Sequence, residues 1–279
     1  MFGIFLTAFG ALAEEVSNSI GKRDVMDKTQ SIFTMGFLQL SGGWLIFLGL
    51  ALFQKDSWML SWQTFPFLLL RIILEIVQIH ITLLAIVKAE RSTFGFIRTL
   101  TIPLLLLIEI LLGYRPGIFQ ILGMGIIVFV FSIIFLKHDF SAKGQKIVLC
   151  TAINAAFSLT LYKYLLTQNN SVVAQQFIVV TVILVYLLLR AWYEKKESPL
   201  RGFTKPKLLV QTGTQTIAFI ADSFAYSFAP ASIILAAKRS SAVLWAVLSG
   251  KNYFKETHST IKIGIAMVLI IGIIFLMIQ

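Results

Sequence analysis

The stretch FPFLLLRIILEIVQIHITLLAIV, residues 65–87, decides the fold class of this chain. It is apolar along almost its whole length, and Arg71 and Glu75 are its only charged residues. A helix crosses the hydrocarbon core of a bilayer, about 30 Å thick, with about 20 mostly apolar residues. The stretch is therefore long and apolar enough to span a membrane as a single α-helix.

The composition of the whole chain is that of a membrane protein. Of its 279 residues, 57% are hydrophobic and 13% are charged, and the mean hydropathy is +0.85. Soluble globular domains carry roughly 25% charged residues. The net charge of +11 does not indicate nucleic-acid binding, because Lys and Arg lie in short connections and form no basic domain. A single cysteine, Cys150, excludes a disulfide framework and a cysteine-rich metal site.

Comparable apolar stretches follow one another along the chain. The first is expected to be a spanning helix rather than a secretory signal, because it has no basic n-region and Glu14 and Glu15 stand where a cleavage site would need small residues. The connections between stretches are too short to fold as domains. We expect an all-α integral membrane protein with ten transmembrane helices, at residues 2–20, 31–53, 65–87, 93–112, 117–136, 146–166, 172–193, 207–228, 230–254 and 259–278.

Two segments that each end a group of five stretches are similar. GYRPGIFQILGMGIIVFVFSIIF, residues 113–135, and FKETHSTIKIGIAMVLIIGIIF, residues 254–275, both place a short charged hinge before an apolar helix that contains Gly123 or Gly264. Internal similarity of this kind is typical of transporters built from repeats. Because five is an odd number of spans, the second group must enter the membrane from the opposite face. The sequence thus predicts two inverted five-helix repeats with a site between them, in domains 1–138 and 139–279.

A family resemblance points to the same architecture. APASIILAAKRSSAVLWAVLSGKNYFKE, residues 229–256, resembles the ninth-helix signature of the drug/metabolite transporter superfamily, in its EamA-type branch. Residues 85–117 are a fainter counterpart, in which Pro103 matches a common mid-helix proline and Tyr114 departs from the family's Glu-Arg-Pro. Nearly the whole chain matches in helix number and order, but only the last third is specific. The resemblance implies that helices 1–4 and 6–9 line a central cavity and that helices 5 and 10 lie outside it.

The connections between the predicted helices differ strongly in charge. Those after helices 1, 3, 5, 7 and 9 carry seventeen Lys and Arg residues, whereas those after helices 2, 4, 6 and 8 carry only Lys55 and Arg115. By the positive-inside rule, the first set faces the cytoplasm and both termini lie outside. Members of the family it resembles usually have both termini in the cytoplasm, so orientation stays open, and we follow the charge asymmetry.

Acidic residues in the first helix are candidates for an ion site. ALAEEVSNSIGKR, residues 11–23, looks like the first helix of small multidrug resistance proteins, in which Glu14 would match the carboxylate that binds protons and cationic drugs. A carboxylate at membrane depth is costly and is therefore a functional candidate. Glu14 and Glu15 point about 100° apart on a helix, so we expect them to differ in role. The alternative is that both reach toward Lys22 and Arg23.

The third helix carries a second polar group. Arg71 and Glu75 are spaced i,i+4, which favours an ion pair within the helix. The alternative is that Glu75, Gln78 or His80 contacts a solute or a proton.

The eighth and ninth helices supply the remaining candidates. Gln211, Gln215 and Asp222 share one stripe, which either faces a cavity or bonds to another helix. Lys238 and Arg239 lie deep in the ninth helix, where they can neutralise Asp222 or Glu109 or bind an anionic group of a solute. The predicted solute- or ion-binding residues are Glu14, Glu75, Gln78, Gln215, Asp222, Lys238 and Arg239.

These features favour a secondary-active transporter that moves a small metabolite or drug-like solute by alternating access, either proton-coupled or as an exchanger. No GxxxxGK[ST] sequence is present, so we expect no ATP coupling within the chain, and no cofactor or metal. One alternative is an intramembrane enzyme acting on lipid or peptide, but neither HExxH nor GxSxG occurs. The other is a non-transporting membrane assembly partner. We expect no enzymatic activity.

The expected partners and location follow from this interpretation. They are a small-molecule solute, protons and the lipid bilayer, with no nucleic acid. We expect a multi-pass protein of the cell (inner) membrane. A homodimer through helices 5 and 10 is open, because their glycines, such as Gly125, Gly264 and Gly272, can equally serve contacts inside the chain.

Overall fold

A computed structural model describes residues 2–53, 58–136, 144–228, 231–256 and 259–278, and these ranges contain helices and no strand, as predicted. The predicted domain boundary at 138/139 and Pro230 lie outside the described residues. The elements in chain order are α1 (Phe2–Met26), α2 (Ile32–Phe53), η1 (Trp62–Thr64), α3 (Phe65–Lys88), α4 (Arg91–Arg98), α5 (Thr101–Leu111), α6 (Ile118–Leu136), α7 (Gln145–Thr167), α8 (Val172–Lys195), η2 (Pro199–Thr204), α9 (Pro206–Ala225), α10 (Ala231–Asn252) and α11 (Ser259–Met277).

Within the described ranges, five helical segments are long and apolar enough to cross a membrane, so the protein is a multi-pass membrane-embedded protein. They are α2, η1 with α3, α4 with α5, α7 and α8. Two shorter apolar helices cover Ile118–Val130 and Thr260–Phe275. The remaining long helices are α1, α9 and α10. Each of them carries polar or charged side chains in its middle turns.

The predicted helix at residues 93–112 is divided into α4 and α5, and Pro103 explains the break. Proline has no N–H, and its ring would collide with the carbonyl of Thr99 in a continuous helix. Instead, the N–H groups of Thr99, Leu100 and Ile102 bond to carbonyls three residues earlier, at 2.9 to 3.1 Å. This tighter turn ends α4 at Arg98, in the interior of the helical bundle.

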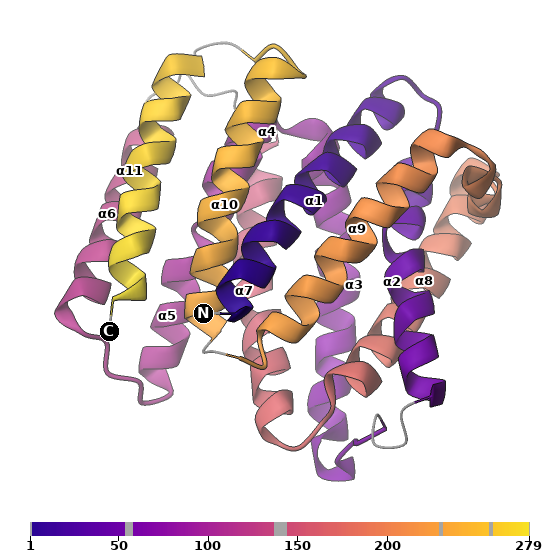
Figure 1. Cartoon of the computed structure of the whole chain (residues 1–279), viewed down its shortest axis with the longest axis horizontal. Helices are drawn as coiled ribbons and strands as arrows, with labels where there is room; N and C mark the ends of the chain where they lie inside the picture. Colours follow the sequence, from indigo (N-terminus) through magenta and orange to yellow (C-terminus); the bar gives the residue numbers. More distant parts are fainter. Residues whose placement is uncertain (1, 54–57, 137–143, 229–230, 257–258, 279) are drawn as a thin grey trace.

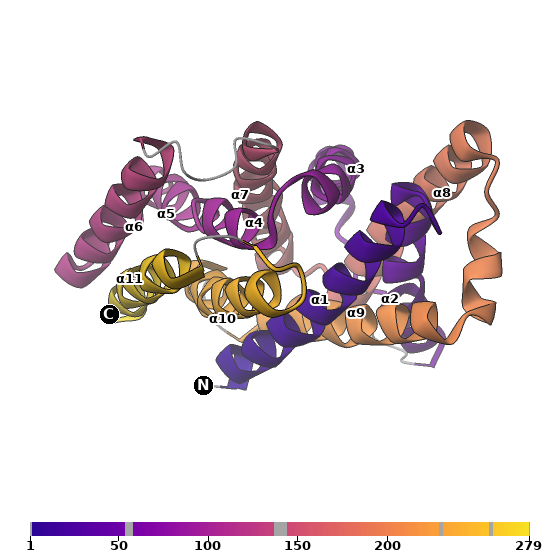
Figure 2. The same cartoon turned by 90° about the horizontal axis from the view of Figure 1, so that it is seen from above.

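The helices pack in pairs that join the two halves of the chain (Figure 1). α1 packs against α9 and α10, and α7 packs against α3 and the α4–α5 segment. α2 lies against α8. α6 and α11 pack against each other at one edge of the molecule, as the view from above also shows (Figure 2).

The connections rich in Lys and Arg meet at one end of the bundle. Lys22, at the end of α1, donates to the Ala89 carbonyl after α3. Glu256, after α10, accepts from the Arg91 N–H at 2.6 Å. Glu197, after α8, accepts from the Ser31 N–H at 3.1 Å. At the opposite end, Ser171 donates its N–H to the Met59 carbonyl at 2.8 Å. Among the described residues, these contacts place the connections after α1, α3, α8 and α10 at one end and the connections before α3 and α8 at the other, whereas Lys55 and residues 137–143 lie outside the described ranges.

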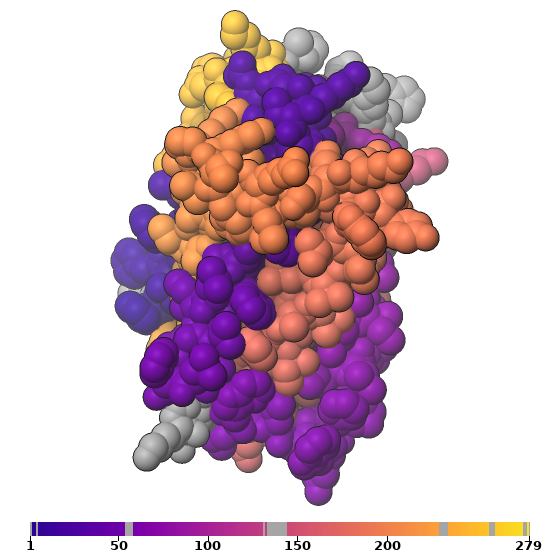
Figure 3. Space-filling model, turned by 90° about the vertical axis from the view of Figure 1, so that its right-hand side faces the viewer, coloured from indigo at the N-terminus to yellow at the C-terminus, as the bar shows by residue number. Residues whose placement is uncertain are grey.

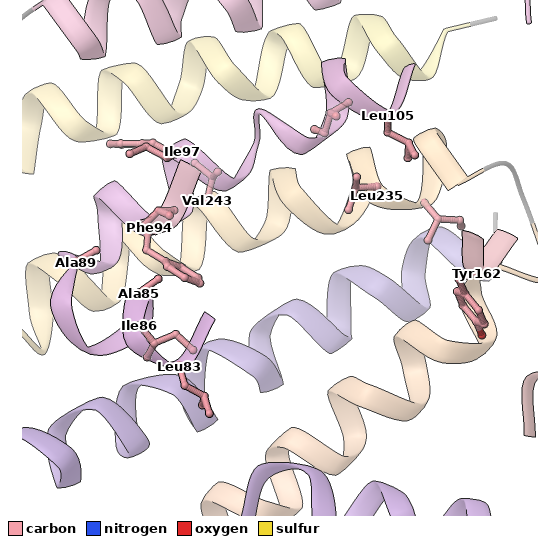
Figure 4. Close-up of a cluster of buried hydrophobic side chains, with 14 of the residues drawn as sticks. Leu83, Ala85, Ile86, Ala89, Phe94, Ile97, Leu105, Tyr162, Leu235 and Val243 are labelled. Atoms are coloured by element: carbon pink, nitrogen blue, oxygen red, sulfur yellow. The ribbon is translucent and has the colours of Figure 1, made fainter. Parts of the chain in front are cut away.

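Apolar side chains form both the interior and much of the outer surface. Figure 4 shows buried side chains between the helices, among them Leu83, Phe94, Leu235 and Val243. The face over α2, α8 and α9 is seen in Figure 3, and large apolar residues of these helices, such as Leu45 and Leu209, are exposed. Exposed apolar residues at this density suit contact with lipid rather than water.

Candidate functional site

A cavity of about 240 Å³ lies inside the bundle. Its lining comes from eight of the described helices, α1, α2, α3, α4, α7, α8, α9 and α10, and includes no residue of α5, α6 or α11. Side chains from both halves of the chain therefore meet in it. All of the residues predicted from the sequence as solute- or ion-binding line this one cavity, namely Glu14, Glu75, Gln78, Gln215, Asp222, Lys238 and Arg239.

One wall of the cavity is an ionic network between four helices. The Lys238 Nζ on α10 lies 2.7 Å from Glu14 Oε2 on α1 and also pairs with Asp222 Oδ2 on α9. Arg98 on α4 approaches Glu14 Oε1 at 3.6 Å. Of the alternatives that the sequence left open for Lys238 and Arg239, the structure shows the neutralisation of Asp222, by Lys238. The network therefore joins α1, α4, α9 and α10 at the cavity.

Arg239, the neighbour of Lys238, is buried beside this network and lines the same cavity. Its Nε has no hydrogen-bond partner. Within the described residues, no carboxylate lies close enough to its guanidinium to form an ion pair. Arg239 therefore differs from Lys238, which forms ion pairs with two carboxylates.

The opposite wall corrects the prediction of an ion pair within α3. Arg71 donates to Gln175 Oε1 at 2.9 Å and to Gln176 Oε1 at 3.3 Å, and its guanidinium lies over the Tyr162 ring at 4.2 Å from the centroid. Glu75 accepts instead from the Ser158 hydroxyl. The i,i+4 pair does not form because side chains of α7 and α8 offer both residues partners, and spacing within one helix cannot reveal partners on another.

The other polar residues of α3 divide between the cavity and its surroundings. Gln78 accepts from Asn154 Nδ2 at 2.8 Å and donates to Thr82 Oγ1 at 2.9 Å, at the cavity surface. His80 does not line the cavity, and its Nδ1 lies 2.7 Å from the Tyr186 hydroxyl. The sequence left open whether His80 packs inside the protein or contacts a solute or a proton. This geometry favours packing.

The stripe predicted on α9 also divides. Gln215 and Asp222 line the cavity, whereas Gln211 is buried toward the basic end and accepts from Gln30 Nε2 at 3.2 Å. Bonding between chain segments therefore accounts for Gln211, and the cavity accounts for the other two residues.

The adjacent acids Glu14 and Glu15 have different surroundings. Glu15 receives two hydrogen bonds from Arg91, Nε to Oε1 at 3.0 Å and Nη2 to Oε2 at 2.6 Å. Ser19 donates to Oε1 at 3.1 Å, and Ser249 on α10 also donates to this oxygen. Glu15 thus holds α1 to α4 and α10, while Glu14, one residue earlier and on another side of α1, faces the cavity.

Several cavity residues were missed in the sequence. Arg98 is the most important, because it contacts Glu14 and lies inside a predicted span, where any charged residue is a functional candidate. The position of Arg98 inside a predicted span could therefore have identified it from the sequence. Tyr162 and Tyr226 also line the cavity, and for these two the sequence left open an aromatic wall of the cavity or a place at the membrane interface. For Asn18 and Gln176 the sequence holds no comparable signal.

A second ionic cluster, around Glu256, joins the connections at the basic end. Its carboxylate accepts from the Arg91 N–H, the Ser92 hydroxyl and Lys262 Nζ, the last at 3.0 Å. Gly250 lies beside it, and a Cβ there would lie 2.7 Å from Glu256 Oε2 and would displace the carboxylate from this position. Burial alone would raise the pKa of Glu256, but these hydrogen bonds and the charge of Lys262 hold that pKa below its usual value.

The lowered pKa predicts how this cluster responds to acid. The charged carboxylate stabilises the folded protein above its ordinary pKa of about 4.3, and this contribution disappears as the pH falls through the lower folded-state value. We expect Glu256→Gln to lower the free energy of unfolding by about 3 kcal/mol at pH 7. The gap to wild type should shrink below about pH 4.

Thermal unfolding in detergent between pH 7 and pH 3 measures this gap. Glu194→Gln is the matched control, because Glu194 pairs with Arg190 on a partly exposed surface and should change stability little. A gap for Glu256→Gln that stays constant down to pH 3 would contradict the assignment.

No protein-family model and no curated protein sequence matches this chain. The functional argument therefore depends on the geometry of the cavity and on the chemistry of the residues that line it.

Proposed function

We propose that this protein is a secondary-active transporter that carries a small solute through the cavity by alternating access. The observation that supports it most is the cavity itself, which lies among apolar helices and is lined by four cationic side chains and three carboxylates, Arg71, Arg98, Lys238, Arg239, Glu14, Glu75 and Asp222. Ionisable groups inside a membrane protein are costly to keep and typically mark solute or ion pathways.

The helix pairs support ten spans arranged as two inverted repeats, domains 1–138 and 139–279. If the first five spans are matched in order with the last five, α1 corresponds to α7 and α3 to α9. The α1–α9 pair then matches α7–α3, and α1–α10 matches α7 with the α4–α5 segment. The α2–α8 and α6–α11 pairs map onto themselves. A pseudo-two-fold axis between the halves would produce this set of contacts, and it would run through the cavity.

The broken α4–α5 segment also suits a transporter. Discontinuous helices at membrane depth commonly form solute sites, because their ends project polar groups into a cavity. Here the break places Arg98 at the end of α4 and beside Glu14. The resemblance to EamA-type drug/metabolite transporters, carried by residues 229–256, is consistent with cavity-lining helices from both halves and with α6 and α11 outside them.

The remaining parts of the proposal concern location and partners. We propose the cell (inner) membrane, with the basic end in the cytoplasm, and protons or a second solute as the coupling species. A homodimer would use α6 and α11. Gly125 and Gly264 face open space, whereas a Cβ on Gly272 would lie 3.0 Å from the Ile126 side chain, so Gly272 serves the α6–α11 contact.

Reconstitution into proteoliposomes tests the function. Radiolabelled organic acids, amino acids, amines and neutral metabolites are offered, and accumulation is measured with and without a pH gradient. We expect wild-type protein to accumulate at least one class and Asp222→Asn to lose this flux. Asp222→Asn should still fold, because asparagine retains a hydrogen-bond acceptor for Lys238 and Lys238 keeps Glu14 as its charged partner.

The control variant is Asp27→Asn, because Asp27 is exposed and pairs only with Arg23 at 3.8 Å in the described structure. It should transport like wild type. Absence of flux for every class, or equal flux in Asp222→Asn, would refute the proposal. Formation of a chemical product without net flux would favour the enzyme alternative.

A further inference from the structure

One buried cation of the cavity, Arg239, forms no ion pair with any described residue, because Glu14 and Asp222 act on it only from a longer distance. Its relative exposure is 4%. Over the ranges that the structure describes, no carboxylate oxygen lies within 4.0 Å of its guanidinium nitrogens, and its Nε lacks a hydrogen-bond partner. It nevertheless lines the cavity.

The nearby carboxylates are already engaged. Glu14 is shared between Lys238 at 2.7 Å and Arg98 at 3.6 Å. Asp222 pairs with Lys238. This wall therefore combines three cations with two carboxylates, and the cation left over is Arg239.

The other buried arginine of the cavity has more partners, although its Nε, like that of Arg239, lacks one among the described residues. Arg71 is 2% exposed, but it donates to two glutamine oxygens of α8 and lies over the Tyr162 ring. In the part of the chain that the structure describes, Arg71 has these partners, whereas Arg239 has no hydrogen-bonded side chain of this kind. Because charges taken out of water are nearly always paired, Arg239 is the position at which an anion from outside the chain would complete the site.

The side chain and the space around it restrict that anion. A guanidinium presents a planar fork of N–H donors that matches a carboxylate in a bidentate geometry. The cavity of about 240 Å³ corresponds to about eight water molecules at ~30 Å³ each, so the solute must be small. Apolar lining residues such as Leu235, Val179 and Phe219 provide a surface for a hydrocarbon body.

We propose that Arg239 binds the carboxylate of a small organic acid, and that organic carboxylates are the solute class of this cavity. This inference rests on the proposed function for its transport aspect. The binding aspect stands on the geometry of Arg239 alone and can be measured without transport.

Ligand-induced thermal stabilisation in detergent tests the binding. The probes are benzoate, its neutral analogue benzamide, its cationic analogue benzylamine, and lactate as a second acid. Benzoate or lactate should raise the apparent melting temperature of wild-type protein, and the neutral and cationic analogues should not. Arg239→Gln should weaken acid binding about tenfold or more. Arg239→Lys should fall between wild type and Arg239→Gln, because it keeps the charge but loses the planar fork.

A second readout separates binding from a structural role. Without ligand, Arg239→Gln should be as stable as wild type or more stable, because the substitution removes a buried charge that has no partner. A residue that held helices together would give the opposite result. Arg23→Gln is the control, since Arg23 is exposed at the end of α1 and should bind the acids like wild type.

Each outcome has one meaning. Failure of both acids to stabilise wild-type protein, equal affinity in Arg239→Gln, or stabilisation by inorganic phosphate instead of the acids overturns the inference. If Arg239→Gln does not fold, unchanged affinity in Arg239→Lys overturns it as well. Acid binding through Arg239 without flux in vesicles would refute the transporter and leave the inference standing. Flux of solutes that Arg239→Gln leaves unchanged would support the transporter and overturn the inference about Arg239.

Discussion

Glu15→Gln is expected to lower the free energy of unfolding by about 3 to 5 kcal/mol. The reason is that Arg91, whose side chain is 1% exposed, would lose the charged partner that receives two of its hydrogen bonds. A buried charge left without its partner costs far more than the pair contributed. The apparent melting temperature in detergent and the urea dependence of unfolding measure the loss.

A double variant checks that the effect comes from this pair. When Glu15→Gln is combined with Arg91→Met, no buried charge is left alone, so part of the lost stability should return. The single Arg91→Met variant completes the thermodynamic cycle. If Glu15→Gln melts at the wild-type temperature, or if the two substitutions simply add, Glu15 does not hold α1 against α4.

Glu14→Gln, one residue earlier, should have the opposite pattern. We expect solute flux to fall at least about 100-fold, which corresponds to about 3 kcal/mol, and the response of flux to pH to change. Stability should change much less than in Glu15→Gln, because Lys238 retains Asp222 and the glutamine retains an oxygen for Lys238 and Arg98. Flux in proteoliposomes at several pH values, measured beside thermal unfolding, distinguishes the two effects.

These two variants control for one another, because the same atoms are exchanged at neighbouring positions of one helix. A Glu14→Gln protein whose flux and pH response are those of wild type would remove Glu14 from the transport pathway. If both variants lose stability equally, the division between a cavity acid and a structural acid is wrong.

The elements of the fold were largely predictable from sequence. Each apolar stretch, such as residues 65–87 and 172–193, became a helix or, at residues 93–112, a pair of helices. Length and apolar character are local properties, and in a membrane every backbone N–H and C=O must bond within its own helix. The break before α5 was also encoded locally, by Pro103, although the prediction treated the segment as one helix.

The membership of the cavity was partly predictable, for a related reason. Glu14, Asp222 and Lys238 stand out because charged residues inside apolar stretches are rare, and such residues turn inward to find partners or water. The same argument applies to Arg98. Asn18 and Gln176 are polar but uncharged. Placing such side chains inside a membrane costs less free energy than placing a charge there, so a single sequence does not mark them as candidates.

The sequence by itself determined that the chain is a helical membrane protein, where its helices lie, and which charged residues are too deep to be ordinary surface groups. Only the tertiary structure decided which of these charges meet. Glu15 joins Arg91, Glu14 joins Lys238, and Arg71 turns to α8 rather than to Glu75. Among the described residues, Arg239 forms no ion pair with a carboxylate. Charge pairing depends on distances of a few ångströms between helices far apart in the chain, and those distances exist only after the helices have packed.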